Sequence, residues 1–261
     1  MIWKNTKILD EFLDESKITE EKEKAEILLI GGGNPIDISD FPNAKKAFRA
    51  GVGTDNINFS NIPVRLPSEK TKSLIYEETA NFACFLMFRM LYEGIGDLDS
   101  WKGVSRNTMN RKTLLVIGKG NIGGRVCEKM SSFMNVESYD TKDDAGYHFP
   151  VSLDKSDIIS LHIPYNNENK NRINKDFLDK IKNDAIIINT ARGGVVNEDD
   201  LYDKMKTSEI RVAFDVFWNE PYSGKLMEFY PDRFYATPHI ASSCKEFFED
   251  CFKDFNLFIN E

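Results

Sequence analysis

The sequence predicts an α/β protein whose main domain is a doubly wound parallel sheet. Residues 157–164, 185–194 and 210–217 contain near-continuous apolar runs, which are typical of parallel strands covered on both faces. Helical patterns separate these runs, so strands and helices alternate along the chain. An earlier apolar run, 114–117, leads directly into a G-x-G-x-x-G turn and a further helical pattern. Together these observations predict a sheet with helices on both faces and a ligand site at the carboxyl ends of its strands.

The glycine turn has the residue types that a dinucleotide pyrophosphate requires. Gly118 permits a sharp turn out of the strand, Gly120 lets the backbone approach the phosphates, and Gly123 lets the helix pack closely on the strand. The N-terminus of the helix adds N–H groups and the positive end of a dipole. A glycine turn that binds nothing is the alternative, but the strand–turn–helix–strand order favours a Rossmann NAD domain. The predicted cofactor-binding residues of the turn are Gly118, Gly120, Asn121, Ile122 and Gly123.

Asp140 ends the second strand of this pattern, 22 residues after Gly118. A carboxylate at this position can accept hydrogen bonds from the adenosine ribose hydroxyls. It would also repel a 2′-phosphate by its negative charge. The sequence therefore predicts NAD rather than NADP as the cofactor.

The bulk composition narrows the possible functions. A chain of 261 residues allows one large or two small domains, and its net charge of −8 argues against nucleic acid or an anionic membrane as a partner. The four cysteines show neither CxxC nor zinc spacing, so we expect no metal site. The N-terminus is charged, unlike a signal peptide, and the most apolar stretch, 82–91, is too short to span a bilayer. We therefore expect a cytoplasmic protein.

The rest of the chain contains four further helix or strand patterns. Residues 1–24 are expected to form one amphipathic helix, with Ile8, Leu9, Phe12 and Leu13 on one face, followed by a charged connection. A strand is expected at 26–30, a buried or interfacial helix at 77–92, a loop at 94–110 that contains Trp101, and a C-terminal helix at 244–261. The glycine-containing segment 50–57 is either an anion-binding nest or a plain turn.

Five polar residues follow the predicted strands at their carboxyl ends, namely His162, Arg192, Asp215, Glu220 and His239. Hydride transfer from reduced nicotinamide to a keto acid needs a cation for the carboxylate, a proton donor, and a carboxylate that orients the donor. Arg192, His239 and Glu220 supply these three types. Alternatively, the arginine caps carbonyl groups and Glu220-Pro221 is a simple turn. His148 lies in a short loop, and we assign it no role.

Five motifs in order resemble the D-isomer-specific 2-hydroxyacid dehydrogenase family over roughly residues 26–243. They are GKGNIGG, DIISLHIPYNNENKNRIN, IIINTARGGVVNEDDL, VAFDVFWNEP and ATPHIASS, and RAGVGTDNI upstream is similar to the family's substrate-domain loop. The resemblance implies an NAD domain at 79–240. It also implies a smaller, truncated, flavodoxin-like substrate-binding domain at 1–78 and 241–261.

The resemblance also implies residue roles. Arg192 would bind the substrate carboxylate, His239 would be the acid–base residue, and Glu220 would pair with it. Val52 and Gly53 would offer backbone amides to the substrate carboxylate. The cofactor side would include His162, Pro164, Thr190, Ala191 and Asp215.

The family resemblance further implies a homodimer through residues 77–110. The chain departs from the family in three places. Asn81 stands where a glutamate is usual, and the sequence is shorter than a typical member both before Glu26 and between Asp140 and Ser156. The catalytic set is complete, whereas the substrate-binding domain is shortened.

The predicted reaction is NAD-dependent interconversion of a 2-keto acid and a D-2-hydroxy acid. The alternative is an NAD-binding regulatory or scaffold protein of the same fold with little turnover. The sequence does not identify the substrate. Five cations either form a phosphate site or are ordinary surface charges, which we favour; they are Lys45, Lys46, Arg49, Arg65 and Lys72.

Overall fold

The computed structural model describes residues 1–261 except 34, 59–61, 93, 95 and 141–151. His148 therefore lies outside the described residues. The chain forms two compact units, which are described separately below. Unit 1 comprises Met1–Glu78 and Ser242–Glu261, and unit 2 comprises Thr79–Ala241. The assignment of 1–78 and 241–261 to substrate binding concerns function and stays a prediction.

Unit 2 is built on one six-stranded sheet in which every neighbouring pair of strands is parallel. The strand order is β10-β9-β11-β12-β13-β14. The predicted parallel sheet is therefore confirmed. The strands are β9 (Thr113–Ile117), β10 (Asn135–Tyr139), β11 (Ile158–Leu161), β12 (Ile186–Asn189), β13 (Arg211–Phe214) and β14 (Phe234–Ala236).

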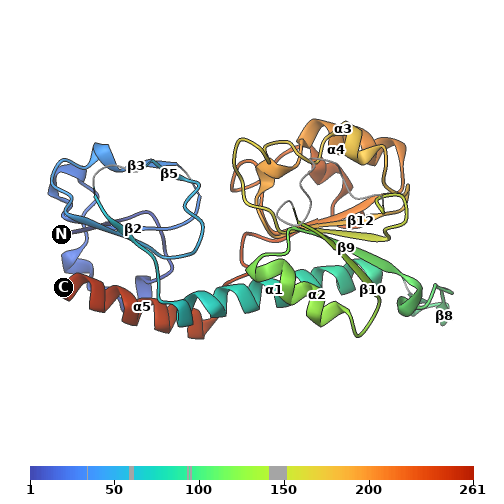
Figure 1. The fold of residues 1–261 in the computed structure, drawn as a ribbon, viewed down its shortest axis with the longest axis horizontal. Coiled ribbons are helices and arrows are strands. Elements are labelled where there is room, and N and C mark those ends of the chain that lie inside the picture. Colours follow the sequence, from blue (N-terminus) through green and yellow to red (C-terminus); the bar gives the residue numbers. More distant parts are fainter. Residues whose placement is uncertain (34, 59–61, 93, 95, 141–151) are drawn as a thin grey trace. The chain divides into compact units, whose positions relative to one another are not determined.

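Helices cover both faces of this sheet, as predicted. Figure 1 shows α1 and α2 on one face and α3 and α4 on the other. Alternate residues of a strand point to opposite faces, so Leu114 and Val116 join the core under the first pair, whereas Leu115 and Ile117 join the core under the second. This two-sided burial explains why the strands read as continuous apolar runs. The helices are α1 (Glu69–Leu91), α2 (Asn121–Met130), α3 (Lys175–Leu178) and α4 (Glu198–Thr207).

The strand order reverses next to the glycine turn. From β9 the chain adds β10 on one side and then crosses to add β11 on the other. The loops at the carboxyl ends of β9 and β11 diverge at such a reversal, and the crevice between them is the usual ligand site of an open α/β sheet. The residues that follow β9, β11, β12 and β13 are therefore the ones that the fold places around a ligand.

Unit 1 contains a smaller parallel sheet. Its order is β1-β2-β4-β6. Flavodoxin-like sheets have the order 2-1-3-4-5, so in the part of the chain that the structure describes, the strand on the far side of β1 is missing. In this sense the domain is truncated. The strands are β1 (Ile2–Lys4), β2 (Ile27–Ile30), β4 (Lys46–Arg49) and β6 (Val64–Arg65), with a separate pair β3 (Ile36–Asp37) and β5 (Ile57–Asn58).

One face of the unit 1 sheet packs on the C-terminal helix α5 (Lys245–Asn260), which confirms the predicted helix. Phe247, Cys251 and Phe255 of α5 contact a core that includes Leu29 and Phe48 of the sheet. Among the described residues, the opposite face is covered by the segments around β3 and β5, which include the 3-10 helix Ile38–Asp40. In the described part of the chain, these short elements stand where a full α/β unit would carry α-helices.

The predicted helix at 1–24 is wrong. The chain instead begins with β1, which pairs in parallel with β2, and continues in three 3-10 turns, Asp10–Phe12, Glu15–Lys17 and Lys22–Lys24. Asp14 accepts a hydrogen bond from the backbone N–H of Ser16, which favours a turn over a continuing helix. The spacing of the apolar residues still predicted which side chains enter the core, since Leu9 is fully buried and Ile8, Phe12 and Leu13 pack beside it.

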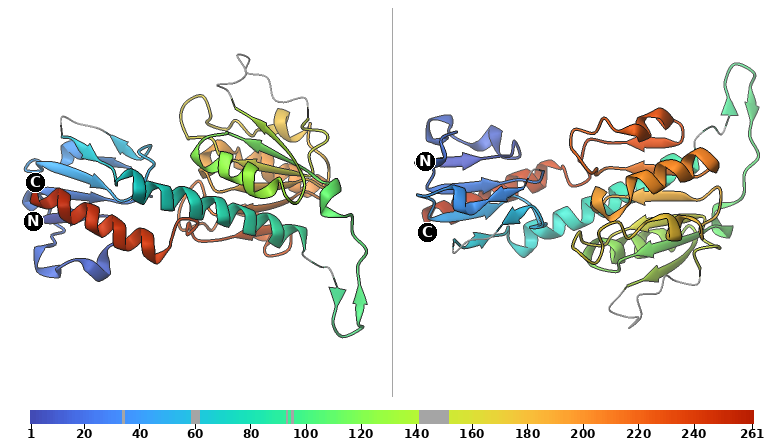
Figure 2. Two further views of the ribbon diagram at one scale, coloured as in Figure 1. Left: turned by 60° about the horizontal axis from the view of Figure 1, so that its bottom comes forward. Right: turned by 90° about the horizontal axis from the view of Figure 1, so that it is seen from above.

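The first residues of α1 and the loop after it also differ from expectation. The helix begins at Glu69 instead of Glu77, because Ser68 accepts from the N–H of Thr71 and Glu69 pairs with Lys72, so polar residues form its first turns. Within the expected loop 94–110, a hairpin forms from β7 (Gly96–Asp97) and β8 (Lys102–Gly103). Figure 2 shows this hairpin extending away from the sheet of its own unit.

Among the described residues, no helix has the length and apolarity needed to cross a bilayer.

Candidate active site

The glycine turn between β9 and α2 has the shape that its sequence predicts. Gly118 has φ +95°, a conformation that glycine adopts readily. A Cβ on Gly123 would lie 1.9 Å from the carbonyl oxygen of Gly118, so the first turn of α2 packs against the strand end at a distance that only glycine allows. At Gly120 a Cβ would meet nothing within 4 Å, which leaves space above the turn. Asn121 and Ile122 are the first residues of α2.

Asp140 directly follows β10 and is fixed to the glycine turn. Its Oδ2 atom accepts a hydrogen bond from the backbone N–H of Lys119 at 2.7 Å. The carboxylate is thereby held beside the turn. Its separation from Gly118, 22 residues along the chain, is the one expected of an acid that binds the adenosine ribose. These residues fit a dinucleotide, with the pyrophosphate at the turn and the adenosine ribose at Asp140.

Two buried polar atoms at the ends of β11 and β12 have no hydrogen-bond partner within the described ranges. They are Nδ1 of His162 and Oγ1 of Thr190. The two residues follow neighbouring strands, because Leu161 and Asn189 are paired in register. The backbone of His162 also contacts the glycine turn, since a Cβ on Gly118 would lie 2.5 Å from its carbonyl oxygen. Buried polar atoms rarely stay unpaired, so this pair supports a bound polar group at these strand ends.

His162 is uncharged in the folded protein. Burial lowers the pKa of its imidazole to about 4, and Nε2 shares a hydrogen bond with Ser160 at 2.8 Å. A neutral ring can offer an acceptor or a donor to a cofactor without adding a charge. Pro164 lies two residues further on, and its carbonyl accepts from the side chain of Asn169 at 2.9 Å.

The depressed pKa of His162 makes stability depend on pH. An unfolded histidine binds a proton below about pH 6.5, whereas the folded protein resists protonation until about pH 4. The contribution is therefore present above pH 6.5 and is lost as the pH falls towards 4, by at most about 3 kcal/mol. We expect the unfolding free energy of the wild type, measured with urea at pH 7, 5.5 and 4.5, to fall more steeply than that of His162→Gln. Parallel pH profiles would contradict this account.

Arg192 follows β12 in a turn that one buried side chain organises. Asn189 is fully buried; its Nδ2 donates to the carbonyl of Arg192 at 2.9 Å, and its Oδ1 accepts from the N–H of Ala191 at 3.0 Å. The guanidinium of Arg192 donates from Nη1 to the carbonyl of Ala191 at 2.7 Å. We did not predict a role for Asn189 from the sequence. The available signal was an amide side chain inside an otherwise apolar strand, which indicates a specific polar contact.

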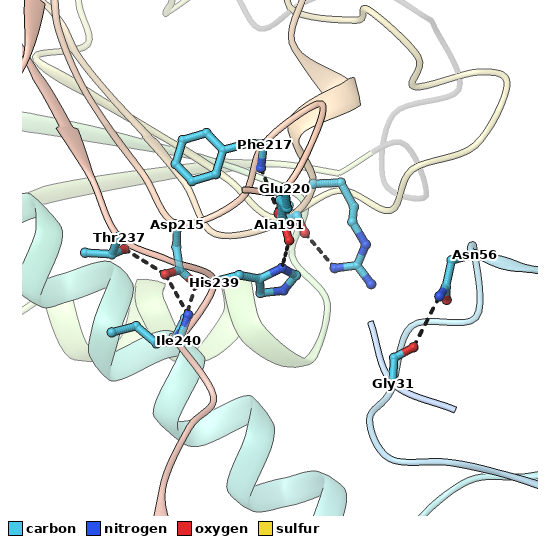
Figure 3. A network of polar contacts seen from close by, with 11 residues as sticks. Gly31, Asn56, Ala191, Asp215, Phe217, Glu220, Thr237, His239 and Ile240 are labelled. Carbon is cyan, nitrogen blue, oxygen red and sulfur yellow. Dashed lines mark hydrogen bonds and ion pairs between the residues drawn. The ribbon is translucent and has the colours of Figure 1, made fainter. Parts of the chain in front are cut away.

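Glu220 and His239 form the predicted pair. Nδ1 of His239 lies 2.8 Å from Oε2 of Glu220, while Oε1 of Glu220 accepts from the N–H of Phe217 at 3.0 Å (Figure 3). Burial raises the pKa of Glu220, but its bonds to His239 and Phe217 and the charge of Arg192 outweigh that effect and lower the pKa below its usual value. Glu220 is therefore a carboxylate. Because Nδ1 faces this acceptor, Nε2 is the ring nitrogen left to exchange a proton with a ligand.

A buried carboxylate holds the loop that carries His239. Asp215 is fully buried after β13; its Oδ1 accepts from the hydroxyl of Thr237 and the N–H of Ile240 (Figure 3). Its Oδ2 accepts from the N–H of Ala241. Burial raises the pKa of Asp215, and these three bonds oppose the rise. His239 sits between the anchored residues with φ +54°, an uncommon conformation for a side-chain-bearing residue. Such local strain is found where the surrounding structure enforces a functional geometry.

The turn that carries Glu220 is anchored by aromatic side chains. The indole N–H of Trp218 donates to the carbonyl of Val196 at 2.7 Å, and the hydroxyl of Tyr222 donates to Glu198 at 2.7 Å. The rings of Phe217 and Tyr222 stack with centroids 4.8 Å apart. These contacts join the turn to the start of α4. They were not predicted, because they depend on which loops the fold brings together.

Four of the five cations considered for a phosphate site are paired with or hydrogen bonded to other groups of the chain. Ion pairs join Lys45 to Glu26, Arg65 to Glu261 and Lys72 to Glu69, while Lys46 donates to the carbonyl of Phe258 at 2.7 Å. These four fit ordinary surface charge. For Arg49 that interpretation is wrong, because its side chain is buried. Val52 and Gly53 lie in the loop that follows this arginine in unit 1.

The fold and the glycine turn define the class of protein, a dinucleotide-binding α/β protein of the dehydrogenase type. Comparison with known proteins makes the class specific. Residues 94–241 match the family model described as "D-isomer specific 2-hydroxyacid dehydrogenase, NAD binding domain". The chain belongs to this family, and unit 2 contains its NAD-binding domain.

Individual relatives agree with this assignment. The hydroxypyruvate reductase of Thermotoga maritima is 30% identical over 92% of this chain and 85% of its own length. The D-3-phosphoglycerate dehydrogenase of Archaeoglobus fulgidus is also 30% identical, over 90% of this chain, but the match spans only 49% of that relative. The solved D-lactate dehydrogenase of Aquifex aeolicus has the same fold, with a TM-score of 0.78, 23% identity, and coverage of 99% of this chain and 94% of that one.

Proposed function

We propose that this chain is an NAD-dependent oxidoreductase that interconverts a 2-keto acid and a D-2-hydroxy acid. The observation that carries the proposal is the 2.8 Å contact between His239 and Glu220, on a loop that Asp215 holds with three hydrogen bonds. A histidine oriented by an ionised carboxylate is suited to exchange a proton near neutral pH. Membership of the D-isomer-specific 2-hydroxyacid dehydrogenase family supports NAD as the cofactor and a 2-hydroxy acid as the substrate class.

Each side chain has one role in this proposal. Arg192 binds the substrate carboxylate, because a guanidinium matches its two oxygens. His239 gives its Nε2 proton to the carbonyl oxygen during reduction and accepts it back during oxidation. Glu220 keeps the imidazole oriented and stabilises its charged form. NADH, when bound, supplies the hydride. Since Asn189 and Asp215 fix the backbone of the two loops, little rearrangement is needed at the moment of reaction.

The cofactor would be held by the residues at the strand ends of unit 2. The pyrophosphate would bind at the glycine turn, and the ribose at Asp140. His162, Pro164, Thr190, Ala191 and Asp215 would line the remainder of the cofactor site. Among the described residues, Nδ1 of His162 and Oγ1 of Thr190 have no hydrogen-bond partner, which supports this arrangement.

We expect Asp140→Ser to increase the use of NADPH. Removing the carboxylate removes its repulsion of a 2′-phosphate, worth about 2 kcal/mol, so the ratio of kcat/KM for NADPH to that for NADH should rise roughly thirtyfold. Steady-state kinetics with both cofactors measure the ratio. Glu137→Ser, on the exposed side of β10, is the matched control and should leave the ratio unchanged. An unchanged ratio in Asp140→Ser would show that Asp140 does not select the cofactor.

Unit 1 would provide the substrate-binding domain, with the backbone amides of Val52 and Gly53 receiving the carboxylate. Because four of the five candidate cations are paired with or hydrogen bonded to other residues and Arg49 is buried, we expect unphosphorylated 2-keto acids to be preferred.

The hairpin of unit 2 supports a homodimer through residues 77–110, since Leu98, Trp101 and Val104 are 78%, 83% and 58% exposed. Sedimentation should then give the mass of two chains. A cytoplasmic location remains our expectation.

The test of the proposed function is NADH oxidation over a panel of 2-keto acids. Glyoxylate, pyruvate, hydroxypyruvate, a branched keto acid and 3-phosphohydroxypyruvate cover the size and charge range. Turnover with at least one acid is the expected result. NADH binding without turnover on any of them would contradict the proposal and favour a regulatory NAD-binding protein.

A further inference from the structure

We propose that Arg49 is a positioning residue that fixes the loop 50–53 for its role with the substrate carboxylate, an inference that rests on the proposed function. Arg49 ends β4, and its side chain is only 5% exposed. A buried cation destabilises a fold unless it is well hydrogen bonded. We therefore expect the buried guanidinium of Arg49 to make specific hydrogen bonds that an apolar side chain could not make.

The guanidinium joins two loops at the carboxyl end of the unit 1 sheet. Nε donates to the carbonyl of Gly53 at 2.5 Å, and Nη1 donates to the carbonyl of Ile30 at 3.3 Å. Ile30 ends β2, the neighbour of β4. One side chain thus links the last residue of one strand to the loop that follows the next strand.

The loop folds closely around this side chain. The N–H of Gly51 donates to the carbonyl of Arg49 at 2.9 Å, and a Cβ on Gly51 would lie 3.3 Å from Cζ of Arg49. Because a peptide group is planar and trans, turning the carbonyl of Gly53 towards Arg49 turns the N–H of Thr54 away from it. Arg49 therefore fixes the orientation of the Gly53–Thr54 peptide, which directly follows the Val52 and Gly53 amides, and Gly51 leaves the room that the guanidinium needs.

Neutral side chains complete the same framework. The N–H of Gly31 donates to Oδ1 of Asn5 at 2.7 Å, and Nδ2 of Asn56 donates to the carbonyl of Gly31 at 3.2 Å (Figure 3). The loops after β1, β2 and β4 are thus tied to one another by Asn5, Arg49 and Asn56. Arg49 is the member that carries a charge. Its positive charge acts also on Cys251 of α5, where it opposes the effect of burial, which raises the pKa of that thiol to about 12.

The test separates a positioning role from a general structural one. We expect Arg49→Met to raise the KM for the keto acid on the order of 10- to 100-fold, with a much smaller change in kcat, because the loop amides bind ground state and transition state alike. The affinity for NADH should not change. Amide hydrogen exchange in a peptide covering 50–57 should become faster. Arg49→Lys keeps the charge but not the planar geometry, so its KM and its exchange rate should lie between those of the wild type and those of Arg49→Met.

Arg65→Met is the matched control, since Arg65 lies in the same unit and pairs with Glu261 at the surface. It should change neither KM nor exchange at 50–57. If Arg49→Met does not fold, Arg49→Lys carries the kinetic test, and added guanidinium ion should restore a low KM to Arg49→Ala.

Two results would overturn the proposal. One is an unchanged KM in Arg49→Met. The other is a rise in KM that is accompanied by an equal fall in kcat and a lower melting temperature, with no local change in amide hydrogen exchange at 50–57. If the wild type reduces no keto acid, the proposed function fails, while the exchange comparison still decides whether Arg49 holds the loop.

Discussion

We expect His239→Gln to lower kcat for keto-acid reduction on the order of 10³-fold while leaving NADH affinity unchanged. Glutamine keeps a hydrogen-bonding group next to Glu220 but cannot transfer a proton. The contact that it replaces is the 2.8 Å bond between Nδ1 and Oε2. Steady-state kinetics give kcat, and the quenching of protein fluorescence by NADH gives the affinity.

The chain offers a matched control for this substitution. His148→Gln removes another histidine, to which the sequence assigns no catalytic role, and should retain full turnover. Glu220→Gln should lie between the two variants, because the imidazole remains but loses its ionised partner. A His239→Gln protein with wild-type kcat would show that another group transfers the proton.

The second large effect is expected at Arg192. Replacing the guanidinium of Arg192 by the ammonium of lysine loses the two parallel hydrogen bonds to a carboxylate, worth about 3 to 4 kcal/mol, so kcat/KM should fall a few hundredfold in Arg192→Lys. Arg192→Ala should be worse, because the charge is lost as well. Asn189 holds the backbone of this turn independently of the Arg192 side chain, so the fold should persist.

Arg111→Lys is the corresponding control, since Arg111 is exposed just before β9. It should behave like the wild type. NADH affinity should be retained in both Arg192 variants. If Arg192→Lys kept its kcat/KM for every keto acid, Arg192 would not be the carboxylate-binding residue.

The fold of unit 2 was predictable because its signals are local. Strands that are apolar on both faces and the glycine turn are properties of short segments, and the structure confirms both of them. The start of the chain was not predictable in this way. Leu9 and its apolar neighbours are spaced as on a helix, yet they reach the core from 3-10 turns, because β1 occupies the edge of the sheet next to β2.

The site was predictable to the extent that strand ends identify it. The need for a proton donor with an orienting carboxylate predicts the pair of His239 and Glu220, and the two side chains lie 2.8 Å apart. The loop-holding roles of Asn189, Arg49 and Trp218 were not predicted, because each of them acts on a backbone group. Contacts of this kind depend on which loops the sheet brings together. Composition and spacing along the chain do not contain that information.

The configuration of the product tests the central claim most directly. The protein would be incubated with NADH and pyruvate, or with the prochiral keto acid that it reduces best, and the hydroxy acid formed would be separated by chiral chromatography. The proposed function predicts the D-isomer in an amount equal to the NADH oxidised. Formation of the L-isomer, or binding of NADH with no hydroxy acid formed from any member of the panel, would contradict it.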